Sequence, residues 1–181
     1  MSVSEFDQLQ IRRELLEMSA RRGLMHTSVS IAGLRISKLR DQQLYLETTF
    51  LNAQIIEKWL KLIIGGYASR RRILELLGQK DIHANVKLEL DEEETLGHLI
   101  GLMKKLRADQ AFLRRLGEFN NLRKEAVHHL FDGGKELAAF DEQAKEYFVS
   151  PECNSLYDGI VTELEKVETE LQKIAELADA K

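Results

Sequence analysis

The chain has 181 residues and a mass of 20.8 kDa, which is the size of one ordinary domain and excludes a fusion of two enzymes. Hydrophobic residues make up 44% of the sequence, charged residues make up 31%, and there is one proline. This composition excludes a disordered chain and a turn-rich β-sandwich, and it favours an all-α bundle of five to seven helices.

The net charge of −4 conceals an asymmetry along the chain. Residues 1–131 carry 21 basic against 17 acidic side chains, whereas residues 152–181 carry three basic against eight acidic ones. An acidic total argues against indiscriminate binding to polyanions, but it permits a local basic face.

Cysteine and histidine usage limits the chemistry that we expect. Cys153 is the only cysteine, which excludes an internal disulfide and favours a cytoplasmic protein. The first residues lack the apolar core of a secretory signal, and no apolar run approaches the ~20 residues that span a bilayer, so we expect no membrane role. His26, His83 and His98 share no ligand-like spacing, and we therefore expect neither a metal site nor a cofactor.

The N-terminal part of the chain predicts a helix from about residue 5 to residue 22, with Gly23 at its end. Its expected packing contacts are Phe6, Leu9, Leu15, Leu16 and Met18. Residues 24–37 mix Ser, Thr and Gly with apolar residues, and their pattern favours no single element.

A long central helix is predicted over about residues 41–64, where apolar residues recur at three- and four-residue steps. Its apolar stripe is wide enough to predict burial on more than one side. We expect Gly65-Gly66 to end this helix, and residues 67–77 to form a shorter one that ends at Gly78. The polar segment 79–90 predicts a connection.

Two further helices are predicted in the middle of the chain. Asp91 followed by Glu94 matches a capping box, which predicts a helix over about residues 91–106. Another helix is predicted over about residues 111–131, ending at Gly133-Gly134.

The C-terminal tail predicts an amphipathic helix over about residues 155–178. Its narrow apolar seam consists of Leu156, Ile160, Leu164, Val167, Leu171, Ile174 and Ala178. Such a seam fits packing on the bundle or on a second copy. Since no repeat or linker interrupts the sequence, we expect one domain over 1–181, with the functional core at about 41–131.

One segment of the 111–131 helix places a charge where apolar packing is expected. At ~100° per residue, one arc of this helix holds Phe119, Leu122, Ala126, Val127 and Leu130. Arg123 falls inside that arc, so its guanidinium should be buried or at an interface, beside a carboxylate or a phosphate. Asn120, Lys124 and His128 form an adjoining polar strip at four-residue steps. One helix therefore offers an anion binder and an imidazole, the side chain that most often serves as a general acid or base.

Arg123, four intervening residues and His128 resemble the Arg-x4-His motif of the HEPN superfamily, the higher eukaryotes and prokaryotes nucleotide-binding domains. An Asn-Asn-Leu sequence precedes the motif, as in that family. Residues 57–63, Glu-Lys-Trp-Leu-Lys-Leu-Ile, are similar to the Glu-x-x-Leu-Lys pattern of an earlier family helix, and residues 95–100 add to the likeness. The resemblance covers roughly residues 41–131.

The resemblance implies metal-independent cleavage of RNA at a site shared by two copies of the motif across a homodimer. His128 would act as general base or acid, and Arg123 would stabilise the phosphorane. Asn121, Lys124 and His129 are candidate substrate-binding residues. Because one chain supplies a single histidine of this kind, acid and base together require two copies.

The expected partners follow from the same resemblance. They are RNA, a second copy of the chain and, as in toxin–antitoxin or host-defence systems, an antitoxin protein. Glu57, in the earlier motif, is expected to support the site by holding Arg123.

Alternatives remain open at this point. Lys124 stands where family members commonly have Asn, Asp or His, which favours a non-catalytic HEPN-like bundle that binds nucleotide, RNA or a protein. Arg123 could instead serve packing alone, paired with a core carboxylate. A helical adaptor with a coiled-coil tail is a third hypothesis. The basic clusters at residues 70–72, 104–105 and 114–115 fit either an RNA contact or solvated helix faces.

Overall fold

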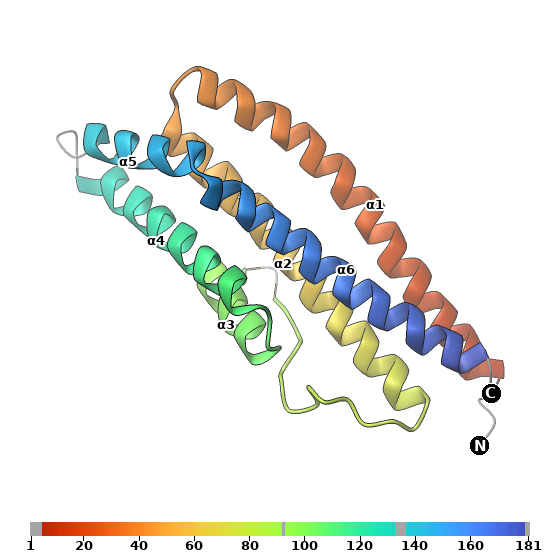
Figure 1. Cartoon of the computed structure of the whole chain (residues 1–181). Coiled ribbons are helices and arrows are strands. Elements are labelled where there is room, and N and C mark those ends of the chain that lie inside the picture. The colour runs from red at the N-terminus through yellow and green to blue at the C-terminus, as the bar shows by residue number, and fades with distance from the viewer. Residues whose placement is uncertain (1–4, 92, 133–136, 180–181) are drawn as a thin grey trace.

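A computed structural model describes residues 5–91, 93–132 and 137–179, and six helices form within these ranges (Figure 1). They are α1 (Glu5–Asp41), α2 (Tyr45–Leu76), α3 (Leu96–Lys105), α4 (Gln110–Asp132), α5 (Leu137–Val149) and α6 (Pro151–Asp179). None of the described residues lies in a strand. The predicted all-α bundle is therefore confirmed.

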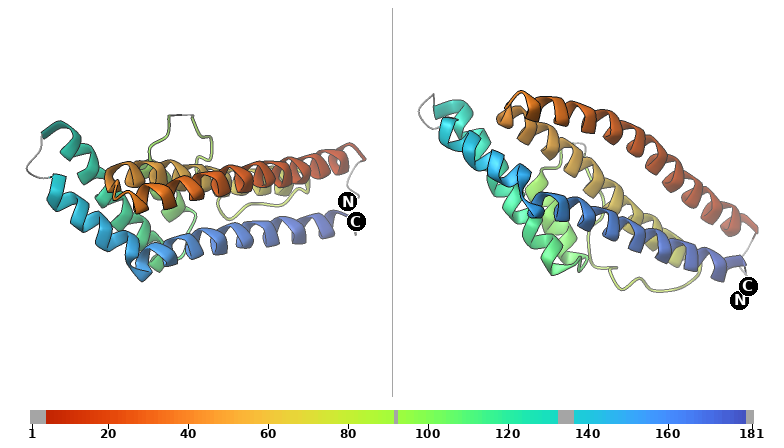
Figure 2. Two further views of the ribbon diagram at one scale, coloured as in Figure 1. Left: turned by 90° about the horizontal axis from the view of Figure 1, so that it is seen from above. Right: turned by 45° about the horizontal axis from the view of Figure 1, so that its top comes forward.

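Helix α2 is the centre of the bundle, since it contacts each of the other five helices. Helices α1 and α6 run along it, while the shorter α3 and α4 lie side by side against it (Figures 1 and 2). Its most deeply buried apolar side chains are Ile56, Leu60, Ile63, Ile64, Tyr67 and Ile73. The burial of the central helix on more than one side, and its contact with the 111–131 helix, agree with the sequence prediction.

Both long N-terminal helices run through glycines that the sequence predicts as helix ends. α1 continues past Gly23, and α2 continues past Gly65 and Gly66, so the separate 67–77 helix is part of α2. A Cβ on Gly66 would lie 2.5 Å from Val167 Cγ1 and 3.2 Å from Met18 Cε. The predicted ends at Gly23 and Gly65-Gly66 were therefore wrong, and at Gly66 the close packing of α1 and α6 offsets the ~1 kcal/mol helix penalty of glycine.

The inward face of α1 differs from the one expected. Phe6, Leu9 and Leu16 were predicted to pack, but they are 67%, 65% and 71% exposed. Met18, also predicted to pack, is buried as expected, and Ile11 is buried although it was not predicted to be. Apolar residues occur on two opposite faces of α1, and the period of one helix does not indicate which face meets the bundle.

Helices α1, α2 and α3 end in the same backbone motif. Gln43, Gly78 and Arg107 adopt positive φ angles of 58°, 66° and 59°. After α2, the Gln79 N–H donates to the Leu74 carbonyl at 2.8 Å, as in a Schellman motif. The ends of α2 and α3 agree with the predicted ends, but only the motif at Gly78 was indicated by its residue, because Gln and Arg carry no sequence signal for this conformation.

Helix α3 begins at Leu96, several residues after the predicted capping box. Thr95 is the N-cap, and its Oγ1 accepts a hydrogen bond from the His98 N–H at 3.4 Å. Asp91 and Glu94 form a turn before the helix, joined by a 3.4 Å backbone hydrogen bond. Helix α4 agrees with the predicted 111–131 helix, while its expected end at Gly133-Gly134 lies outside the described residues.

The C-terminal third contains one helix that the sequence predictions lack. α5 buries Phe140, Ala144 and Phe148 at four-residue spacing, a helical period in a short segment. α6 begins at Pro151, where the fixed φ of proline suits the first helical turn. Every residue of the predicted seam of α6 is buried, and within the described parts of the chain no helix is long and apolar enough to span a bilayer.

Candidate functional site

The position of the candidate site is set by the buried face of α4. Phe112, Leu116, Phe119, Leu122 and Ala126 are all nearly inaccessible, and they fix the rotation of α4 against the bundle. This rotation turns Arg123 toward α2 and α3, so that its side chain is 25% exposed. Arg123 is therefore three-quarters buried, as its place in the apolar arc indicates. Val127, also expected in the arc, is 37% exposed.

Glu57 of α2 is the acidic neighbour of this guanidinium. Its Oε1 lies 3.9 Å from Arg123 Nη2, and its side chain is also 25% exposed. The pairing expected between these residues is present in the structure. In a partly buried setting such a pair is less screened than a surface ion pair, because water reaches only one edge of it.

The same carboxylate also joins α2 to α3. Glu57 Oε1 accepts a hydrogen bond of 3.1 Å from the Leu96 N–H, one of the unpaired donors in the first turn of α3. A negative charge is favoured there by the helix dipole. Glu57 therefore holds the arginine of α4 and the start of α3 together.

Asn120 completes the immediate surroundings of the arginine. Its Oδ1 accepts a hydrogen bond of 3.4 Å from Arg123 Nη1, and the residue is only 7% exposed. A Cβ on Gly97 would lie 3.8 Å from Asn120 Nδ2, so the first turn of α3 passes directly over this amide. With Glu57 and Asn120 on its inner side, the guanidinium keeps its remaining donors for a group arriving from solvent.

Asn120 is the site residue that sequence reasoning underrated. It was placed in the polar strip of α4, but with no role beside the arginine. The available signal was its position three residues before Arg123, which puts the two side chains on neighbouring turns of one helix.

The other predicted site residues lie toward solvent. Asn121, Lys124 and His128 are exposed on α4, and the strip from Asn120 through Lys124 to His128 therefore runs from the interior to the surface. The side chain of His129 lies outside the described residues. In a single copy, the arginine is held in the bundle while the histidine is free to meet another molecule.

A second histidine stands at the start of α3. His98 Nδ1 lies 3.0 Å from Glu94 Oε2, and the imidazole is about half exposed. In the sequence analysis His98 was considered as a metal ligand and, within residues 95–100, as part of the resemblance, but was given no role in the site. No group of three or more potential metal-ligating side chains occurs within the described ranges.

The cluster at residues 70–72 serves the fold. Arg70 pairs with Asp81 at 2.6 Å, Arg71 donates to two backbone carbonyls of the 79–86 segment, and Arg72 pairs with Glu14 of α1 at 2.7 Å. These contacts fix the long connection and α1 to α2. Of the two functions considered for this cluster, its contacts support neither an RNA contact nor a freely solvated face.

Cys153 and His83 are also occupied by the fold. Burial raises the pKa of the Cys153 thiol, which disfavours the reactive thiolate. Burial lowers the pKa of His83, whose ring packs edge-on against Tyr67 at 5.5 Å.

Comparisons with protein-family models, with curated proteins and with solved structures found no match to this chain. The site is therefore interpreted from its own residues and from the resemblance of the motif.

Proposed function

We propose that this protein is a HEPN-type, metal-independent endoribonuclease whose site is completed by a second copy of the chain. The observation that carries the proposal is the environment of Arg123. A three-quarters buried guanidinium, held by Glu57 and Asn120, shares one helix with the exposed imidazole of His128. A guanidinium fixed in this way can stabilise a phosphorane with little reorganisation.

The chemistry needs a base, an acid and positive charge. One His128 removes the proton from a ribose 2′-hydroxyl, whose oxygen attacks the adjacent phosphorus. The P–O5′ bond breaks, and the 5′-oxygen takes a proton from the His128 of the second copy. The products are a 2′,3′-cyclic phosphate and a 5′-hydroxyl end, and no metal or redox partner is consumed.

Arg123 binds the phosphate in this scheme, and Lys124 adds a second cation on the exposed side of α4. Glu57 is a positioning residue, because it orients the guanidinium from the inner side and does not face the phosphate. Asn121 and His129 remain candidate substrate contacts. We place the protein in the cytosol as a toxin or defence component that an antitoxin protein restrains.

The decisive test is cleavage of labelled RNA in EDTA by the purified chain. We expect cleavage that His128→Ala and Arg123→Ala each reduce by about 10²-fold or more, the scale of lost acid–base or charge stabilisation. His26→Ala is the matched control, since His26 is exposed on α1 and should leave the rate unchanged. Equal rates for the wild-type and His128→Ala proteins would contradict the proposal.

A site shared between two copies can also be tested by mixing variants. Mixing Arg123→Ala with His128→Ala chains should give heterodimers whose activity differs from that of either parent. A monomer that cleaves RNA at the wild-type rate would rule out sharing.

Binding of RNA without cleavage is the second candidate function, and the exposed Lys124 beside Arg123 favours it. Lys124→Asn separates the two functions. Metal-free cleavage by both proteins, slower for Lys124→Asn, supports the enzyme, whereas weaker RNA retention with no cleavage by either protein supports the binding module.

A further inference from the structure

A stripe of large apolar side chains runs along the outer face of α1. Each of its members is more than 60% exposed: Phe6, Leu9, Leu16, Leu24, Ile31 and Leu34. At about 100° per residue, these positions fall within an arc of roughly 80° on the side of α1 opposite the buried Ile11 and Met18. Single exposed apolar residues are ordinary, but a continuous stripe along a 37-residue helix marks an interaction surface.

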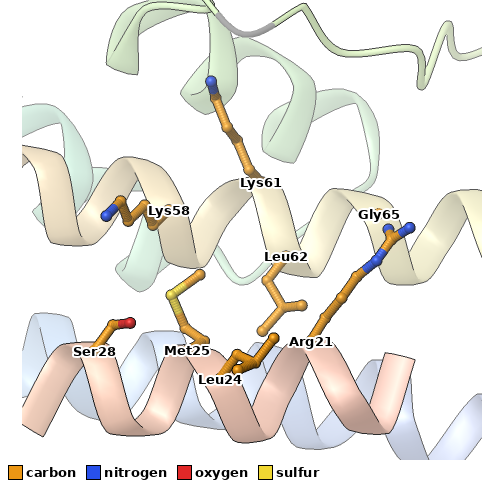
Figure 3. A pocket seen from close by; sticks show the side chains of 8 residues that line it. All are labelled: Arg21, Leu24, Met25, Ser28, Lys58, Lys61, Leu62 and Gly65. Atoms are coloured by element: carbon orange, nitrogen blue, oxygen red, sulfur yellow. The ribbon is translucent and has the colours of Figure 1, made fainter. Parts of the chain in front are cut away.

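The inner face of α1 contributes few fully buried side chains to the bundle. Ile11 and Met18 are its only buried residues within the described part of the chain. Beyond them, a groove of about 440 Å³ separates α1 from α2, and Met25 and Leu62 point toward one another across it (Figure 3). The C-terminal half of α1 therefore contacts the bundle through partly buried side chains such as Met25, and none of its described residues is fully buried.

The stripe is symmetric about Ala20. Phe6 and Leu34, Leu9 and Ile31, and Leu16 and Leu24 lie at equal distances before and after this residue. The interrupting polar positions, Arg13 and Thr27, are also equidistant from it. An apolar pattern that reads the same in both directions is what a two-fold, antiparallel helix pair requires, because each residue must face its counterpart in the other copy.

The spacing within the stripe fits the same geometry. Leu9 and Leu16 are seven residues apart, as are Leu24 and Ile31, which is the heptad interval that keeps a seam in contact along two supercoiled helices. At the centre, the small side chain of Ala20 would face its own copy and permit close approach.

From this symmetry we propose that α1 pairs with α1 of a second copy, antiparallel, around a two-fold axis at Ala20. Leu16 of each copy packs on Leu24 of the other, Leu9 on Ile31, and Phe6 on Leu34. Arg13 faces Thr27, so the pairing sets no like charges opposite one another. Covering six such side chains on each of two chains, at on the order of 100 Å² apiece, removes roughly 1,200 Å² from water, the lower limit for a specific stable interface.

This interface is separate from the ribonuclease proposal. Among the described residues, α1 contacts α2 and α6 but not α4, which carries Arg123 and His128. Pairing through α1 therefore leaves the arginine–histidine face open. If both faces pair, copies of the chain assemble beyond a dimer.

Disulfide trapping tests the register of the pair. Leu9→Cys mixed with Ile31→Cys should give a covalent dimer under mild oxidation, while Leu9→Cys alone should not. Ala20→Cys should link to its own copy. The native Cys153 is buried and does not compete. Val161→Cys, exposed on α6, mixed with Ile31→Cys is the matched control that should stay uncoupled. Linking of Leu9→Cys to itself, or no linking in any mixture, would overturn the antiparallel pair.

Sedimentation tests the same proposal without a covalent bond. The double variant Leu16→Lys with Leu24→Lys should lower the mass of the wild-type species, to half where α1 is the only pairing surface, with unchanged helicity because both positions are exposed. Val161→Lys with Leu177→Lys, exposed on α6, should leave the mass unchanged. A monomeric wild-type protein would overturn the proposal, and one that also floats with anionic vesicles would identify a membrane surface as the occupant. Arg123→Ala should not alter the α1 cross-links. A failure of the α1 pairing can therefore be distinguished from a failure of the ribonuclease proposal.

Discussion

Helices α1 and α6 lie along the same central helix, yet they use their apolar residues in opposite ways. α6 has one narrow seam, and all seven of its residues are buried against the bundle. α1 has two apolar faces, with two fully buried residues on the inner face and six large exposed ones on the outer face. Among the described residues, two large apolar side chains of α6 are exposed, Val161 and Leu177, against six on α1.

The difference shows that the number of apolar faces on a helix sets how many packing surfaces the helix needs. A helix with one apolar face needs one partner surface, and α6 has it in α2 and α4. A helix with two opposed apolar faces needs a surface on each side. The bundle supplies one for α1, and the second must come from another molecule or stay in water.

The largest expected effect is on a matched pair of isoleucines. Ile160→Ala in the seam of α6 should lower the free energy of unfolding by about 2–4 kcal/mol, because it leaves a cavity at a fully buried position. Ile31→Ala on the outer face of α1 removes the same atoms from an exposed position, and it should cost under about 0.5 kcal/mol in the isolated chain. Urea unfolding at a protein concentration too low for association measures both.

Equal losses for the two isoleucine variants would contradict the contrast between the helices. A loss at Ile31 that grows with protein concentration would instead reveal the second partner of α1.

The next effect separates two adjacent glycines in α2. Gly66→Ala should destabilise the protein by about 1–2 kcal/mol, because the new Cβ would lie 2.5 Å from Val167 Cγ1 and push α6 outward. Gly65→Ala meets no atom within 4 Å and should stabilise the helix by about 0.5–1 kcal/mol. The midpoint temperatures of thermal unfolding of the two variants should therefore shift in opposite directions. A rise in both midpoints would show that α6 moves aside at little cost.

The smallest effect concerns the polar tie between α1 and α2. Arg72 and Ser69 donate hydrogen bonds to Glu14, and this lowers the pKa of its carboxyl below the usual 4.5. A depressed pKa in the folded state stabilises the protein above pH 4.5, and the contribution disappears as the pH falls through the lowered value.

Glu14→Gln should therefore cost about 0.5–1 kcal/mol at pH 7, a figure reduced for the half-exposed Arg72, and progressively less as the pH falls below 4.5. Glu89→Gln, whose side chain is 89% exposed, should change little over the same pH range. A pH-independent loss at Glu14 would assign its role to packing.

Much of the fold could be predicted from the sequence, because helical periodicity is local. The seam of α6 and the apolar arc of α4 are complete within single helices, and the arc alone placed Arg123 on a buried side. The glycine after α2 marked its end for the same reason, since the positive φ belongs to one residue.

Only the tertiary structure decided what depends on contacts between distant segments. Gly66 stays helical because Val167, a hundred residues away in sequence, packs on it. The hydrogen bond from the first turn of α3 to Glu57, and the choice of which α1 face meets the bundle, likewise require that separate helices be placed together. A helix specifies its own faces, but the partner of each face is set by the summed packing of the whole chain.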